Sequence, residues 1–90
     1  MGIELKDIWK LTHSIVGLDF LYFDTAIEVK QTPHRDPVRI WGVTVNKNGS
    51  VWLMTSDQQW HQLETTDLNY NLVAASVYQR LKMYSKKQTA

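Results

Sequence analysis

The chain has 90 residues, which is enough for one domain and too few for two. Its hydrophobic fraction of 43% and charged fraction of 21% are typical of a folded globular protein rather than a disordered one. It contains no cysteine, which excludes disulfides, thiolate metal sites and a cysteine nucleophile, and its formal net charge of +1 provides no overall attraction to nucleic acid or to an anionic membrane.

Residues 3–16 are predicted to form an amphipathic helix. Their apolar side chains recur with the three- and four-residue spacing of one helical face. Gly17 follows, and glycine commonly ends helices because it adopts left-handed backbone angles without a steric penalty. The N-terminal segment resembles no signal peptide, and the longest nearly uncharged stretch, residues 11–18, is too short to span a bilayer. Together with the absence of cysteine, this favours a cytoplasmic protein without membrane attachment.

Residues 20–30 alternate apolar and polar side chains and are predicted to form a strand. A helix starting at Asp19 is the alternative, because Phe20, Phe23 and Ile27 also fit a helical period. The segment QTPHRDP at 31–37 contains two prolines and is predicted to be a loop.

Asn48-Gly49 predicts a hairpin between strands at residues 38–46 and 50–56. A two-residue type I′ turn at these positions pairs Val45 with Trp52 and Val43 with Met54. This register predicts that one face of the hairpin packs against the core, namely Trp41, Val43, Val45, Trp52 and Met54. It predicts that the opposite face carries the apolar side chains of Ile40, Val51 and Leu53.

A turn at 56–59 precedes a short strand predicted at residues 59–64. Trp60 and Leu63 point to opposite faces of that strand, so placing Leu63 in the core places Trp60 on the far face. Thr65-Thr66-Asp67 is typical of a helix N-terminus, and a second helix is predicted over residues 67–84. Residues 85–90 are expected to fray.

The predicted order is helix, four strands, helix. Strands joined by short connections favour an antiparallel β-meander of three to four strands, and two helices can cover one face of it. We therefore predict a single α+β domain over residues 1–90, a two-layer sandwich of order αββββα with both helices on one sheet face.

The segment VAASVYQRL at 73–81 superficially resembles the alanine-rich second helix of double-stranded RNA-binding domains. That family also combines a helix, a three-stranded meander and a second helix. It needs lysines at the start of its second helix to reach phosphates, whereas this chain has TTDLNYN at 65–71, with an acid and no lysine. The strand predicted at 20–30 is a further difference. We interpret the resemblance as shared topology and assign no family.

No catalytic or cofactor-binding motif appears in the sequence, and His13, His34 and His61 lack the spacing of metal ligands. We therefore predict a protein that is not an enzyme and needs no cofactor or metal. Two groups of residues are candidates for binding. The predicted interaction surface consists of Trp60, Leu53, Ile40 and Val51. The candidate basic contacts are Arg35, Arg39, Arg80, Lys82, Lys86 and Lys87.

Three functions are compatible with these features. The first hypothesis is an interaction module that binds a protein partner, or a second copy of itself, through the open face of the sheet. The second is a nucleic-acid-binding accessory protein that uses the basic C-terminal helix end with Arg35 and Arg39. The near-zero net charge of the chain disfavours nucleic acid as a partner. The third is a small-ligand binder with an aromatic pocket between the sheet and the helices.

Overall fold

A computed structural model of the protein describes residues 2–30 and 37–88. In this part of the chain, two helices and four strands follow the predicted order αββββα. They are α1 (Leu5–Val16), β1 (Phe20–Val29), β2 (Val38–Val45), β3 (Val51–Thr55), β4 (Trp60–Gln62) and α2 (Tyr70–Gln88). The strands form one antiparallel sheet in the order β1-β2-β3-β4. The predicted loop lies, apart from Pro37, outside the described residues.

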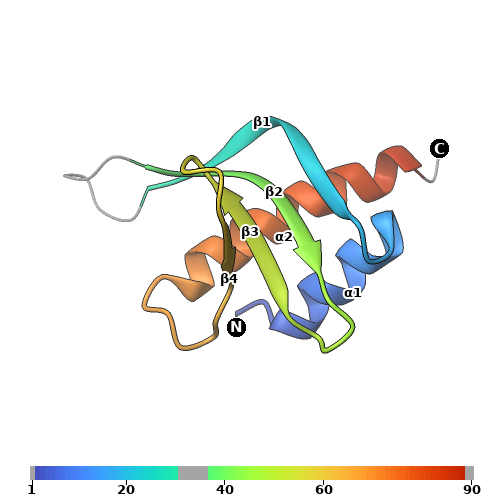
Figure 1. The fold of residues 1–90 in the computed structure, drawn as a ribbon, viewed down its shortest axis with the longest axis horizontal. Helices are drawn as coiled ribbons and strands as arrows, with labels where there is room; N and C mark the ends of the chain where they lie inside the picture. Colours follow the sequence, from blue (N-terminus) through green and yellow to red (C-terminus); the bar gives the residue numbers. More distant parts are fainter. Residues whose placement is uncertain (1, 31–36, 89–90) are drawn as a thin grey trace.

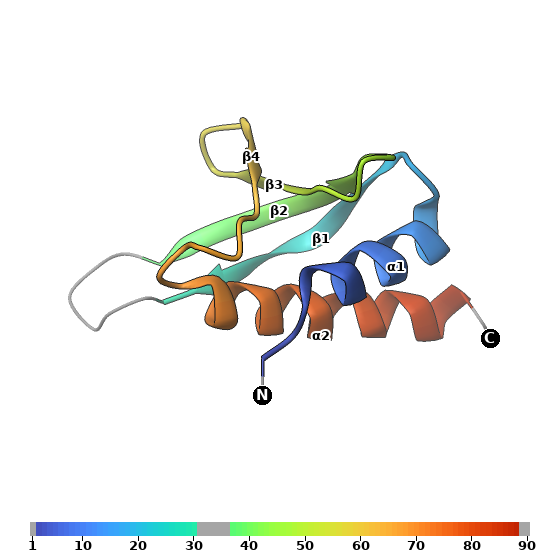
Figure 2. The ribbon, with the colours of Figure 1, turned by 90° about the horizontal axis from the view of Figure 1, so that it is seen from below.

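Both helices lie on the same side of the sheet, and the strands pass in front of α2 in Figure 1. Figure 2 shows the two layers from the side, with the other face of the sheet uncovered. The predicted two-layer α+β sandwich is therefore confirmed. No helix among the described residues carries an apolar stretch long enough to cross a membrane.

The hydrophobic core lies between the sheet and the two helices. Both helices and strands β1, β2 and β3 contribute apolar side chains, and Thr12 can be buried among them because its hydroxyl donates to the Ile8 carbonyl within α1 (2.8 Å). The buried apolar residues are Ile8, Phe23, Ile27, Val29, Ile40, Val43, Val45, Val51, Leu53, Leu63, Tyr70, Ala74, Val77 and Leu81.

The helix ends differ in how well they were predicted. Gly17 ends α1 with φ 69°, and its N–H donates to the His13 carbonyl (2.8 Å), as expected. The predicted start of the second helix at 67 is wrong, because α2 begins at Tyr70, after a turn in which the Tyr70 N–H donates to the Asp67 carbonyl. The second helix also extends past its predicted end at residue 84, since α2 continues to Gln88. No glycine or proline follows Tyr70 to end the helix earlier.

Strand β1 has an interruption in its middle. Phe20–Tyr22 and Ile27–Val29 pair with β2, and the register shifts between these two stretches. Side chains from α2 contact the interrupted part. The Asp24 backbone N–H donates to the Tyr84 hydroxyl (3.1 Å), and the Arg80 guanidinium donates to the Thr25 carbonyl (2.6 Å). These bonds connect the outer strand to the helix layer.

The predicted turn between β2 and β3 has the right position and the wrong type. A type I′ turn needs positive φ at both central residues, and among the described residues only Gln58, Gly17 and Gly49 have positive φ. The Gly49 N–H donates to the Asn46 carbonyl, and the Asn46 N–H donates to the Ser50 carbonyl (both 3.0 Å). The turn is therefore a three-residue loop, 47–49, with Gly49 in the left-handed position.

The longer loop shifts the register by one residue and reverses the faces of β3. Val45 pairs with Val51 and Val43 with Leu53, whereas Trp52 and Met54 pair with Thr44 and Gly42. An irregularity between Ile40 and Gly42 also turns the first part of β2. Three residues predicted for the open face, Ile40, Val51 and Leu53, are consequently in the core, at 1%, 0% and 5% exposure. Three predicted for the core, Trp41, Trp52 and Met54, are not fully buried.

We expect the substitution Gly49→Val to destabilise the protein by more than about 1 kcal/mol, because a β-branched side chain strains a residue with φ 91°. A Cβ at Gly49 meets nothing within 4 Å, so steric overlap with neighbours contributes little. Urea unfolding of the variant and of Lys47→Val, in the same loop, tests this backbone effect. An unchanged midpoint for Gly49→Val would contradict the left-handed assignment.

Candidate functional site

The open face of the sheet is the surface on the side away from the helices. Strand pairing places one row of residues directly across all four strands on this face, namely Tyr22, Gly42, Met54 and Trp60. Leu63 is buried in the core. The prediction that Leu63 faces the core and Trp60 the opposite side is therefore confirmed by the register.

Three aromatic rings form a cluster on the open face. Phe20 and Tyr22 lie next to each other on β1, with ring centroids 5.0 Å apart. The Trp60 ring extends to both of them from the opposite edge of the sheet, with centroid distances of 6.2 Å and 6.3 Å. Gly42 on β2 leaves the space that these rings occupy, because a Cβ there would lie 3.2 Å from the Tyr22 ring and 3.5 Å from the Trp60 ring.

Three further large side chains extend this cluster. Trp52 and Met54 lie on the open face of β3, and both are half-buried. Trp41 lines a surface pocket of about 590 Å³ together with Met54 and Arg39. We call the six residues the aromatic face: Phe20, Tyr22, Trp41, Trp52, Met54 and Trp60. The exposed fractions of Phe20, Tyr22 and Trp41 are 55%, 51% and 40%. Exposed aromatic side chains gathered on one surface are typical of binding sites.

The aromatic face is uncharged, and a charged pair lies at one end of it. Glu28 on β1 and Arg39 on β2 are cross-strand partners, and their side chains form an ion pair of 3.3 Å. The β3–β4 connection lies at the opposite edge and rises on the side away from the helices (Figure 2). The surface therefore offers apolar contact area with little net charge.

Of the six residues of the aromatic face, only Trp60 was predicted from the sequence to lie on the open face. Trp60 lies on the open face as predicted, whereas the candidates Ile40, Val51 and Leu53 are core residues because of the shifted register. Phe20 and Tyr22 were missed, although they alternate with Leu21 and Phe23 along the predicted strand. That alternation is the signal that could have assigned them to the open face.

The candidate basic contacts do not form one cluster in the described structure. Arg39 pairs with Glu28, and Arg80 donates to Thr25 while lying over the Phe23 ring (5.4 Å). Lys82 is exposed and lies over the Tyr78 ring (5.4 Å). Arg35 lies outside the described residues, and Lys86 and Lys87 belong to the last turn of α2. Both described arginines therefore make intramolecular contacts, which a phosphate ligand would have to replace.

The β3–β4 turn contains a second cluster of polar side chains, around Asp57. Its carboxylate accepts hydrogen bonds from the Thr55 hydroxyl (2.6 Å), the Gln59 N–H (3.0 Å) and His61 Nε2 (2.9 Å). These bonds fix a three-residue loop in which Gln58 takes the left-handed position with φ 62°. Both Asp57 and His61 are about half-exposed. The Thr55 hydroxyl donates to Asp57 rather than to His61, so the cluster is not arranged as a nucleophile with its base.

The three hydrogen bonds to Asp57, foremost that from Thr55, lower the pKa of its carboxyl from 3.8 to about 2. Since the folded pKa lies below the unfolded value, the carboxylate contributes stability above about pH 4, and this contribution is lost as the pH falls towards 2.

We expect a carboxyl ¹³C titration to show the lowered pKa of Asp57. Thr55→Val should raise this pKa, and Ser56→Ala, in the same turn, should leave it unchanged. An ordinary pKa of Asp57 in the wild-type protein would contradict the described bonds.

Among the described residues, no group of three or more His, Asp or Glu side chains is arranged to hold a metal ion. Comparison with protein-family models, curated proteins and solved structures gave no significant match to this chain. The candidate site therefore rests on the geometry of the open face.

Proposed function

We propose that the protein is a non-enzymatic interaction module that binds a protein partner through the aromatic face, and that this partner is a second copy of the chain. The observation that supports the proposal is the gathering of six large apolar side chains on the one sheet face that the helices leave uncovered. Because a cysteine-free small domain suits a reducing compartment, we place this module in the cytoplasm.

The electrostatics of the surface favour a second copy over a charged partner. The aromatic face is uncharged, and Glu28 and Arg39 at its end neutralise each other. The six residues themselves therefore add no like-charge repulsion when two copies stack face to face, whereas a nucleic-acid strand would meet aromatic rings without the cationic groove that holds its backbone.

The size of the surface predicts a dimer of modest affinity. A large aromatic side chain has about 150–250 Å² of surface, so the exposed parts of the six residues amount to a few hundred Å². Stable interfaces bury about 800 Å² per partner. The aromatic face is therefore large enough to form the centre of an interface, and polar neighbours such as Thr44 and Gln62, which flank Trp52, would form its rim.

Sedimentation equilibrium and light scattering up to about 1 mM protein test the proposal. We expect the wild-type protein to dimerise and Trp60→Ala to weaken the dimer by about 30-fold or more, since a central aromatic anchor contributes about 2 kcal/mol or more. Phe20→Glu is the second variant, because it places a charge on an exposed position at the end of β1 and leaves the core unchanged.

Met83→Ala is the matched control, because Met83 is an equally exposed apolar residue on α2, in the other layer. It should dimerise like the wild-type protein. Circular dichroism verifies that every variant is folded. A wild-type protein that stays monomeric over the whole concentration range, or a folded Phe20→Glu variant that dimerises normally, would refute the proposal.

A further inference from the structure

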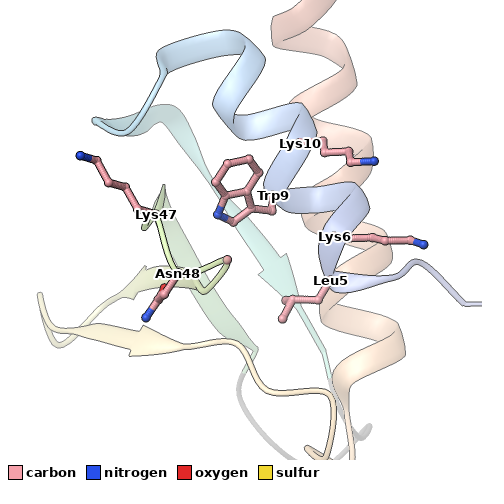
Figure 3. Close-up of a pocket in the computed structure, with 7 residues that line it drawn as sticks. Leu5, Lys6, Trp9, Lys10, Lys47 and Asn48 are labelled. Carbon is pink, nitrogen blue, oxygen red and sulfur yellow. The ribbon is translucent and has the colours of Figure 1, made fainter.

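A pocket outside the aromatic face lies between helix α1 and the β2–β3 turn, and it has a volume of about 530 Å³. Figure 3 shows Trp9 and Leu5 extending from α1 towards the turn. Pockets of this size that combine apolar walls with a few polar groups are the usual sites for small molecules. The lining residues are Leu5, Lys6, Trp9, Lys10, Lys47, Asn48 and Gly49.

The aromatic wall of the pocket is fixed in place by its neighbours. The Trp9 Nε1–H donates to the Asn46 carbonyl (2.7 Å), which connects α1 to the turn across the pocket. The His13 ring stacks on Trp9, with centroids 4.8 Å apart and an interplanar angle of 25°. A side chain held at two points loses little conformational entropy when a ligand binds, so the pocket is preorganised.

The charged residues that line the pocket all have the same sign. Lys6 lies 3.2 Å from Glu4 and is partly neutralised. In the described part of the chain, Lys10 and Lys47 form no ion pair, and both are exposed. In Figure 3 the Lys10 and Lys47 side chains lie on opposite sides of Trp9, and their ammonium groups point away from the pocket. Because lysine stems are flexible, these groups can turn towards an anion that enters between them.

We propose that this pocket binds a small aromatic carboxylate, with its ring against Trp9 and Leu5 and its carboxylate near Lys10 and Lys47. The apolar lining accounts for the ring, and the two unpaired ammonium groups account for the negative charge. This site is independent of the aromatic face, since it lies between α1 and the β2–β3 turn and shares none of the six residues.

The test is an NMR titration of the full chain with 2-naphthoate and, separately, with the neutral alcohol 2-naphthylmethanol. Each of the four tryptophans has one indole N–H, so the signal of Trp9 reports on the pocket and those of Trp41, Trp52 and Trp60 report on the aromatic face. We expect saturable shifts at Trp9, Asn48 and Gly49, and about tenfold tighter binding of the carboxylate than of the alcohol.

The double variant Lys10→Gln/Lys47→Gln should bind both compounds equally, because it keeps the apolar wall and removes the charges. Lys82→Gln, which removes an exposed lysine from α2, should keep the wild-type preference for the carboxylate. Equal affinity of the wild-type protein for acid and alcohol would overturn the proposal. Shifts confined to Trp41, Trp52 and Trp60, or no saturable shift at Trp9 up to about 10 mM ligand, would overturn it as well.

Discussion

Leu53→Ala is expected to destabilise the protein by about 2–5 kcal/mol, whereas Met54→Ala, at the next position of β3, is expected to cost about 1 kcal/mol. Leu53 is 5% exposed and belongs to the core, so its truncation leaves a cavity between the sheet and the helices. Met54 lies on the open face and is half-buried, so its truncated side chain is replaced largely by solvent.

The two variants remove similar amounts of apolar material from one strand, and each serves as the control for the other. Urea unfolding of both measures the difference. A domain has only about 5–15 kcal/mol of stability in total, so a loss of the expected size in Leu53→Ala is easily measured. A larger loss in Met54→Ala than in Leu53→Ala would favour the register with a two-residue turn.

Gly42→Val is expected to cost about 1–3 kcal/mol through overpacking. A Cβ at this position would lie 3.0 Å from the Leu21 carbonyl oxygen, which belongs to the backbone of β1 and can move only with the strand. The branched side chain would also displace the rings of Tyr22 and Trp60 from the space above Gly42. We therefore expect altered tryptophan fluorescence together with the lower stability.

Thr44→Val is the control for this substitution, because Thr44 lies two residues further along β2 on the same face and is half-buried. A β-branched residue replaces another there, so stability should change by less than about 1 kcal/mol. An unchanged unfolding midpoint for Gly42→Val would mean that the rings of Tyr22 and Trp60 do not occupy the position described for them.

The sequence was sufficient to predict the order of the elements. Helical spacing, strand alternation and the positions of Gly17 and Gly49 are local properties, and each has a direct physical meaning in the chain. The choice of a strand over a helix for residues 20–30 was also right, because alternating β-formers outweighed a partial helical period.

The faces of β3 could not be predicted with the same certainty, because they depend on the φ angle of Asn48. The letters Asn-Gly are compatible with a two-residue loop and with a three-residue loop that ends in a left-handed glycine. Side-chain bonds accompany the longer loop, in which the Ser50 N–H and hydroxyl both donate to Asn48 Oδ1 (3.1 Å and 2.7 Å). A loop that is longer by one residue exchanges the core-facing and surface-facing side chains along the whole of β3.

The candidate site could be predicted only in part, because it too depends on contacts between strands. The side of Trp60 followed from Leu63, three residues further along the chain, and no turn geometry entered that inference. The partners of Trp60 come from β1, at the other edge of the sheet, and their proximity depends on Gly42 between them. Contacts across two intervening strands follow from the assembled sheet rather than from any local pattern.

The interruption of β1 has a consequence for how the protein behaves when it is concentrated. An outer strand with regular spacing is a template on which another chain can add a strand, and repeated addition leads to fibres. Here Asp24 and Thr25 lie in the interrupted stretch, and their backbone groups already bond Tyr84 and Arg80 of α2. An incoming strand would find two short regular stretches with different registers. We therefore expect concentrated solutions to contain discrete small species and no growing fibrils.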